Sequence, residues 1–79
     1  MAFYVKIVKQ TEKSASVMYS FWSVPESVGT LEIDKTSGEV TLLSPLKGDE
    51  QERVFMRAAV KLRREWQEGR LPDSTEWAS

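Results

Sequence analysis

Two acidic side chains stand two residues apart in a predicted strand, a spacing that places both carboxylates on the same side of the chain. Glu32 and Asp34 fall on the polar face of residues 30–34. Paired carboxylates can carry out general acid–base catalysis, but one of them then needs a pKa raised by burial or by a close like charge. A strand in a short hairpin leaves such a pair in water, so we expect no acid–base catalysis from it.

Two other acidic segments are candidates for binding a hard cation. Asp49, Glu50 and Glu52 are close together in sequence, but helix capping accounts for them more simply. Residues 34–39 resemble a calcium loop only in outline, because the second and third ligand positions carry no acidic or amide side chain. We therefore predict no metal site.

The chain lacks the residue types on which most nucleophilic and zinc chemistry depends. It contains no cysteine and no histidine, so its serine and threonine hydroxyls have no imidazole base. The four glycines stand at separate element boundaries and form no phosphate-binding loop. The sequence thus predicts no catalytic residue and no cofactor, and we do not expect an enzyme.

Length and charge narrow the class of protein further. A chain of 79 residues has the size of one domain, so we assign residues 1–79 to a single domain with a barely sufficient core. The formal net charge of −1 gives no overall attraction to nucleic acid or to an anionic membrane. No stretch approaches the roughly 20 apolar residues of a spanning helix. Together with the lack of cysteine, this favours a cytoplasmic protein with no membrane partner.

Four segments of the first half have the patterns of strands: residues 2–9, 15–24, 30–34 and 39–43. They alternate with a period of two or are rich in β-branched and aromatic side chains. Pro25 ends the second segment, and Gly38 supplies the positive φ of the turn between the last two. These patterns predict a sheet over residues 2–43.

One amphipathic helix is predicted over about residues 50–68. Asp49 is a good N-cap residue, and Glu52, three positions later, completes a capping-box pattern. Gly69 is placed for the left-handed position that follows a helix end. The apolar stripe that would face a core consists of Phe55, Ala58, Ala59, Leu62 and Trp66. Residues 70–79 are expected to form a mostly polar tail.

These elements indicate an α+β fold, a four-stranded antiparallel meander with one C-terminal amphipathic helix packed on one face (ββββα). The strand residues expected to face the helix are Phe3, Val5, Ile7, Val17, Tyr19, Phe21, Leu31, Ile33, Val40 and Leu42. Four strands span roughly 19 Å, whereas one helix covers about 10 Å. The helix can therefore cover much of one face of the sheet but not both.

The uncovered face is unusually apolar for a surface in water, and we take it as the candidate interaction surface. Its apolar residues are predicted to be Tyr4, Val8, Met18, Trp22 and Leu43. Exposed apolar patches of this kind mark interfaces. Three covers are open: the tail folding back through Leu71 and Trp77, a second copy of the chain, or a different partner.

The helix face opposite the apolar stripe forms a candidate basic patch made of Arg53, Arg57, Lys61 and Arg64. Arginine suits bidentate recognition of carboxylate or phosphate groups. The patch is either a solvated outer face, a docking stripe for an acidic protein partner, or a contact to the nucleic-acid backbone.

From these observations we expect a small non-catalytic protein-interaction module that forms a homodimer or binds one protein partner through the uncovered sheet face. The alternative is an accessory nucleic-acid-binding protein that uses the basic patch on the helix.

Overall fold

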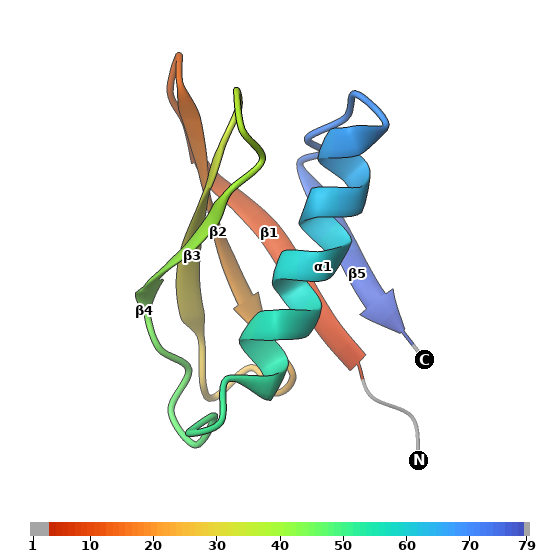
Figure 1. Cartoon of the computed structure of the whole chain (residues 1–79). Helices are drawn as coiled ribbons and strands as arrows, with labels where there is room; N and C mark the ends of the chain where they lie inside the picture. The colour runs from red at the N-terminus through yellow and green to blue at the C-terminus, as the bar shows by residue number, and fades with distance from the viewer. Residues whose placement is uncertain (1–3, 79) are drawn as a thin grey trace.

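The computed structural model describes residues 4–78, which form five antiparallel strands and one helix (Figure 1). In chain order these are β1 (Tyr4–Glu12), β2 (Ser16–Trp22), β3 (Gly29–Asp34), β4 (Val40–Ser44), α1 (Arg53–Gln67) and β5 (Ser74–Ala78). The strands make one sheet in the order β4-β3-β2-β1-β5. The predicted α+β class with an antiparallel sheet is confirmed, and the sheet has one strand more than predicted.

The additional strand, β5, comes from the segment that the sequence suggested was a tail. It pairs antiparallel with β1, so that Trp77 lies opposite Val5 and Thr75 opposite Ile7. Two bonds hold the approach to this strand: the Tyr19 hydroxyl donates to the Pro72 carbonyl at 2.7 Å, and the Lys9 amide donates to the Asp73 carbonyl at 2.8 Å. The helix therefore lies between strands in the sequence instead of ending the fold.

The core lies between α1 and one face of the sheet. The strand residues with no exposed surface are Val5, Ile7, Val17, Tyr19, Phe21, Leu31 and Ile33. Ala58 and Leu62 of α1 are fully buried against them, and Leu46 adds to the core from the loop after β4. Val40 and Leu42 are half-buried around this cluster. Phe3, which was also expected on this face, lies outside the described residues.

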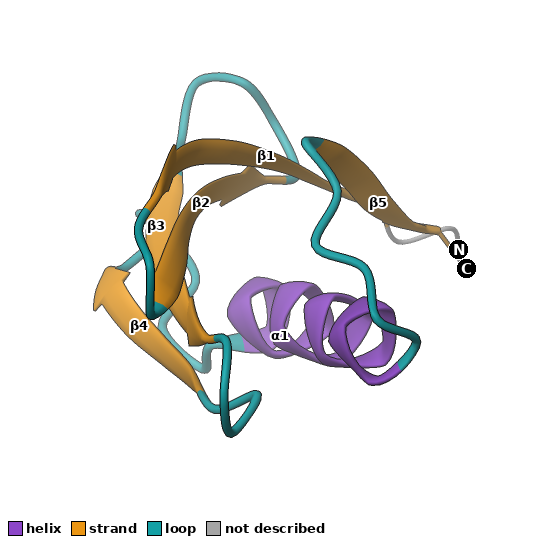
Figure 2. Cartoon of the chain, turned by 90° about the horizontal axis from the view of Figure 1, so that it is seen from above, coloured by secondary structure: helices purple, strands orange, loops and turns teal. Residues whose placement is uncertain are grey.

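The sheet curls around α1 instead of lying flat beneath it. Seen from above, the helix sits in the concave side of the sheet, with β5 at one end of the curve and β4 at the other (Figure 2). The small side chains of Ala58 and Ala59 allow the helix backbone to approach the strands closely. One helix thus closes the concave side, and the convex side faces away from it.

The start of α1 differs from the predicted capping box. Asp49 does cap the helix, because its two carboxylate oxygens accept hydrogen bonds from the amides of Val54 and Phe55 at 3.0 Å each. Glu52, however, precedes the first helical residue in a left-handed conformation with φ of 56° and makes no side-chain cap. The Glu52 amide donates to the Asp49 carbonyl at 2.9 Å. A tight turn therefore separates Asp49 from the helix, and the reciprocal bond of a capping box is absent.

The end of α1 follows the prediction. Gly69 has a φ of 83°, its amide donates to the Trp66 carbonyl, and the Arg70 amide donates to the Glu65 carbonyl, both at 2.9 Å. These two bonds form a Schellman motif, which satisfies carbonyl groups that the helix leaves unpaired. The chain can then turn back toward the sheet and enter β5.

Trp66 connects the end of the helix to the β3–β4 turn. The Trp66 indole Nε1 donates to the Lys35 carbonyl at 2.8 Å. Gly38 in the same turn has a φ of 76°, and a Cβ added to it would stand 2.5 Å from the Trp66 ring. Glycine is required there twice, for the backbone conformation and for the close approach of the ring.

We predict that Gly38→Ala destabilises the protein more than Gly48→Ala. Both glycines have positive φ, so each alanine variant incurs a backbone cost of about 1–2 kcal/mol. Gly48 has open space around it, whereas the Gly38 variant also forces Trp66 to move, which adds about 1–3 kcal/mol. Urea denaturation of the two variants measures the difference in the free energy of unfolding. Equal losses of stability would show that Trp66 does not pack against this turn.

Candidate interaction surfaces

The convex face of the sheet is the surface predicted from the sequence. No helix or other strand of residues 4–78 lies across it, since α1 packs on the concave side (Figure 2). Tyr4 is 42% exposed and Leu43 is 48% exposed. Val8, Met18 and Trp22 are half-buried.

Polar side chains separate these apolar residues from one another. Trp22 lies opposite Lys6, Val8 lies opposite Ser20, and Met18 lies opposite Glu32. These polar neighbours are largely paired: Lys6 lies 3.8 Å from the Glu76 carboxylate, and the Gln10 amide donates to the Ser20 hydroxyl at 2.8 Å. The convex face is therefore a mixed surface, not a continuous apolar patch.

The segment after the helix does not cover the convex face. Trp77 lies opposite Val5, a buried core residue, so its side chain is on the concave side with α1. The ring is half-buried against the core, and the Arg64 guanidinium lies over it at 5.4 Å from the ring centroid. The sequence left three possible covers for the convex face: the tail, a second copy of the chain, or a different partner. The position of Trp77 excludes the tail.

The four residues of the predicted basic patch do not form a uniform surface. Arg53 and Arg64 are exposed, and Arg57 donates to the Arg53 carbonyl at 3.3 Å. Lys61 is half-buried and lies 4.0 Å from the Glu65 carboxylate. Arg64 turns toward Trp77 on the β5 side of the helix. The four residues are thus divided between the side of α1 that faces away from the sheet and the side next to β5.

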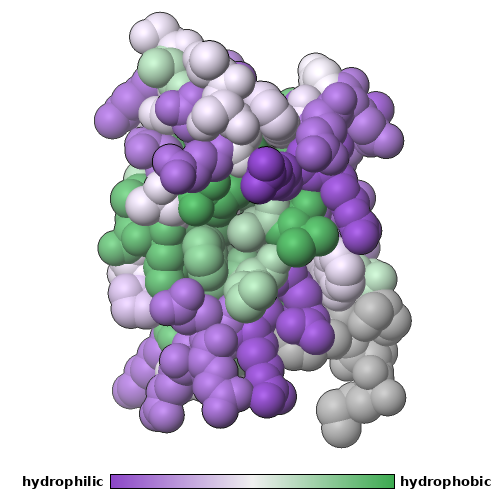
Figure 3. Space-filling model, in the orientation of Figure 1, coloured by the Kyte–Doolittle hydropathy of each residue, from purple (hydrophilic) through white to green (hydrophobic). Residues whose placement is uncertain are grey.

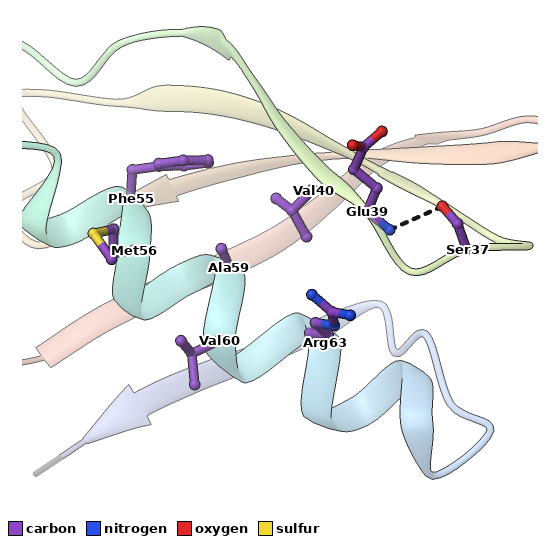
Figure 4. A pocket seen from close by; sticks show the side chains of 8 residues that line it. All are labelled: Ser37, Glu39, Val40, Phe55, Met56, Ala59, Val60 and Arg63. Carbon is purple, nitrogen blue, oxygen red and sulfur yellow. Dashed lines mark hydrogen bonds between the residues drawn. The ribbon is translucent and has the colours of Figure 1, made fainter.

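A groove between β4 and α1 is a further candidate surface, and it was not predicted from the sequence. It has a volume of about 470 Å³ and is lined by Ser37, Glu39, Val40, Phe55, Met56, Ala59, Val60 and Arg63 (Figure 4). Met56 is 57% exposed and Val60 is 40% exposed. The face that carries β4 and α1 shows an apolar band across its middle, with polar surface above and below it (Figure 3).

The sequence did contain a signal for this groove. Met56, Val60 and Arg63 have the spacing of one helix face, next to the stripe that faces the core. The predicted core stripe runs from Phe55 to Trp66 and includes neither Met56 nor Val60. Met56 and Val60 form one wall of a groove only because β4 lies beside this face of α1.

The acidic residues considered for chemistry have structural bonds instead. The Asp34 carboxylate accepts hydrogen bonds from the amides of Thr36 and Ser37 at 2.7 and 3.0 Å, and these bonds lower the pKa of Asp34, with Ser37 the larger cause. Glu32 accepts a bond from the Ser16 hydroxyl at 3.2 Å. A general acid needs the opposite shift. Within residues 4–78, no group of three or more acidic side chains is placed to hold a metal ion.

A charged cluster links the β1–β2 hairpin to the β3–β4 turn. The Glu12 carboxylate accepts hydrogen bonds from the ammonium groups of Lys35 and Lys9, each at 2.8 Å. These bonds lower the pKa of Glu12 from 4.5 to about 2, with Lys35 the larger cause. Glu12 is exposed, whereas Lys9 and Lys35 are half-buried, and the cluster connects the two turns to each other.

Comparisons with known proteins give no relative for this chain: no protein-family model, no curated protein and no solved structure matches it. Over the described part of the chain, no helix is both long and apolar enough to cross a membrane.

We predict that the Glu12 carboxyl titrates well below 4.5 and that Lys35→Ala raises its pKa. The folded-state pKa is below the ordinary value, so the stabilisation is fully present above about pH 4.5 and is lost as the pH falls toward 2. Carboxyl-detected NMR titration measures the midpoint. Lys13→Ala is the matched control, because the ion-pair partners of Glu12 within residues 4–78 are Lys9 and Lys35, not Lys13. An unchanged midpoint in Lys35→Ala would contradict the prediction.

Proposed function

We propose that this chain is a small, non-catalytic protein-interaction module that associates with itself through the convex face of its sheet. The observation that supports this most directly is the position of α1, which packs against one face only. The opposite face retains large, partly exposed apolar side chains, among them Tyr4, Met18 and Trp22. Aromatic residues are the type most often found as anchors of protein interfaces.

The mixed character of the convex face fits an interface between molecules that are also stable apart. Non-obligate interfaces are about as apolar as the rest of a protein surface, with roughly 56–58% non-polar area. The pairing of Lys6 with Glu76 and of Gln10 with Ser20 keeps the polar groups satisfied in the free protein. Association would then bury Trp22 and the other apolar side chains of the convex face without leaving charges unpaired.

The same proposal holds that the module has no catalytic activity. Histidine and cysteine are absent from the sequence, and the hydrogen bonds to Asp34 stabilise its ionised form. We further propose a cytoplasmic location, on the ground that a chain without cysteine has no need of an oxidising compartment.

The alternative function is nucleic-acid binding through Arg53, Arg57, Lys61 and Arg64. The exposure of Arg53 and Arg64 on α1 favours it. The ion pair of Lys61 with Glu65 and the stacking of Arg64 on Trp77 favour it less, because both contacts already engage the cations. The formal net charge of −1 adds no long-range attraction to phosphate. We therefore prefer the protein-interaction module.

Trp22→Ser and Tyr4→Ser should each shift the protein from dimer to monomer. Tyr4 is exposed, so its replacement tests the face without a cost to the core, and it serves in case Trp22→Ser unfolds. Light scattering over a range of concentrations measures the oligomeric state. Val60→Ser is the matched control, since Val60 is 40% exposed on α1, away from the convex face. A wild-type dimer that survives both replacements would refute the proposed face.

Nucleic acid should not bind in a salt-dependent manner. A titration with single-stranded and double-stranded DNA at two salt concentrations measures this, because each phosphate contact adds to the salt dependence of binding. Binding at low salt that disappears in an Arg53→Glu, Arg64→Glu variant would favour the alternative function. Fluorescence anisotropy of a labelled oligonucleotide is a sufficient measurement.

A further inference from the structure

The groove between β4 and α1 lies directly beside an edge of the sheet. Within residues 4–78, β4 pairs with β3 alone, so the backbone groups on its other side have no strand partner. The groove is open along the same side, with Val40 on one wall and Met56 and Val60 on the other (Figure 4). Unpaired backbone and exposed apolar side chains thus occur together at one place.

We infer that this edge and groove bind an extended acidic and apolar segment of a partner protein, which adds to β4 as a sixth strand. This surface is separate from the convex face, so the inference goes beyond the proposed self-association and can fail or succeed independently of it.

The backbone of β4 would supply the affinity of such a complex. A peptide added to a sheet edge gains a ladder of main-chain hydrogen bonds, and pockets for alternate side chains give the specificity. Because the sheet curls around α1, a strand added next to β4 continues that curve over the helix (Figure 2). Alternate side chains of the new strand would then point into the groove toward Met56 and Val60.

The lining of the groove calls for apolar side chains at those positions. Val40, Phe55 and Ala59 are half-buried, and Met56 and Val60 are the exposed large apolar residues of α1. Methionine adapts its shape to different partners, which suits a surface that binds a segment and not a rigid domain. Covering this lining would remove apolar area from water on both molecules.

The positive charge on the groove side of α1 favours acidic groups in the partner. Arg63 lines the groove, and its side chain points toward the β4 wall (Figure 4). Neither Arg63 nor Arg53 takes part in an ion pair within residues 4–78. The carboxylate of α1, Glu65, is on the β5 flank and is held by Arg70 and Lys61. Glu39 is the acidic residue of the groove, and it lies on the opposite wall from Arg63.

A second copy of the chain fits this edge poorly. In a two-fold antiparallel pairing of β4 strands, the start of one strand meets the end of the other, where Leu43 and Ser44 offer no carboxylate to Arg63. A partner strand with acidic ends can offer that carboxylate, so we assign the surface to a different protein.

The test uses a labelled peptide of about nine residues, in which valine and threonine alternate and two glutamates stand at each end. Fluorescence anisotropy should show binding to the full chain, and backbone NMR shifts should concentrate in β4 and on the groove flank of α1. Met56→Glu should weaken binding at least about tenfold, because it places a charge in the apolar lining. Arg63→Glu should weaken binding about tenfold and favour a peptide with lysines in place of the glutamates.

Tyr4→Ser is the control, since Tyr4 lies on the convex face in β1, away from β4, and its replacement should leave peptide binding unaltered. A failure of self-association through the convex face would leave the peptide result valid. A failure of peptide binding would likewise leave the convex-face proposal untouched. Absence of binding at millimolar peptide, or binding that Met56→Glu leaves unchanged, would overturn the inference. Self-association that Met56→Glu abolishes and Tyr4→Ser preserves would also overturn it, because a second copy would then occupy the groove.

Discussion

A single fifteen-residue helix has to bury one face of a five-stranded sheet, and the shape of the whole molecule depends on this mismatch. A helix covers about 10 Å, whereas five strands span roughly 24 Å. The sheet meets the constraint by curling, so that strands at both of its ends reach the helix. On the β5 side the contact includes Thr75, Glu65 and Trp77. On the β4 side, the contact between the helix and the sheet stops at the groove. The two binding surfaces proposed above are thus what one helix leaves uncovered.

Much of the fold followed from local patterns that do not depend on distant residues. The buried strand residues from Val5 to Ile33 and the helix residues Ala58 and Leu62 had the expected periodicity, and Gly69 ended the helix as its position suggested. The fifth strand was missed because Thr75 and Trp77 are the two residues of β5 that face inward, too few to establish an alternation. Pairing with β1 decides the structure of that segment, and a pattern read along the chain does not contain this information.

Of the two candidate surfaces, one could be predicted from the sequence and the other could not. The convex face could be predicted, because strand alternation alone assigns Tyr4, Met18 and Trp22 to the side opposite the core. The groove could not, because Met56 and Val60 acquire a meaning only from the position of β4 beside them. The start of the helix is a similar case. Asp49 was identified as the cap, but the turn that places Glu52 in a left-handed conformation was not.

The pairing of β1 with β5 has a consequence for the order in which the protein folds. The hydroxyl of Tyr4 donates to Glu76 across 72 residues of sequence, whereas β1, β2, β3 and β4 pair with their neighbours in the chain. Contacts between distant residues carry a larger loop-closure entropy and slow folding. During synthesis the first four strands can therefore associate well before β5 leaves the ribosome. Over that interval the β1 edge stays open, and it is then a second place where another strand can add.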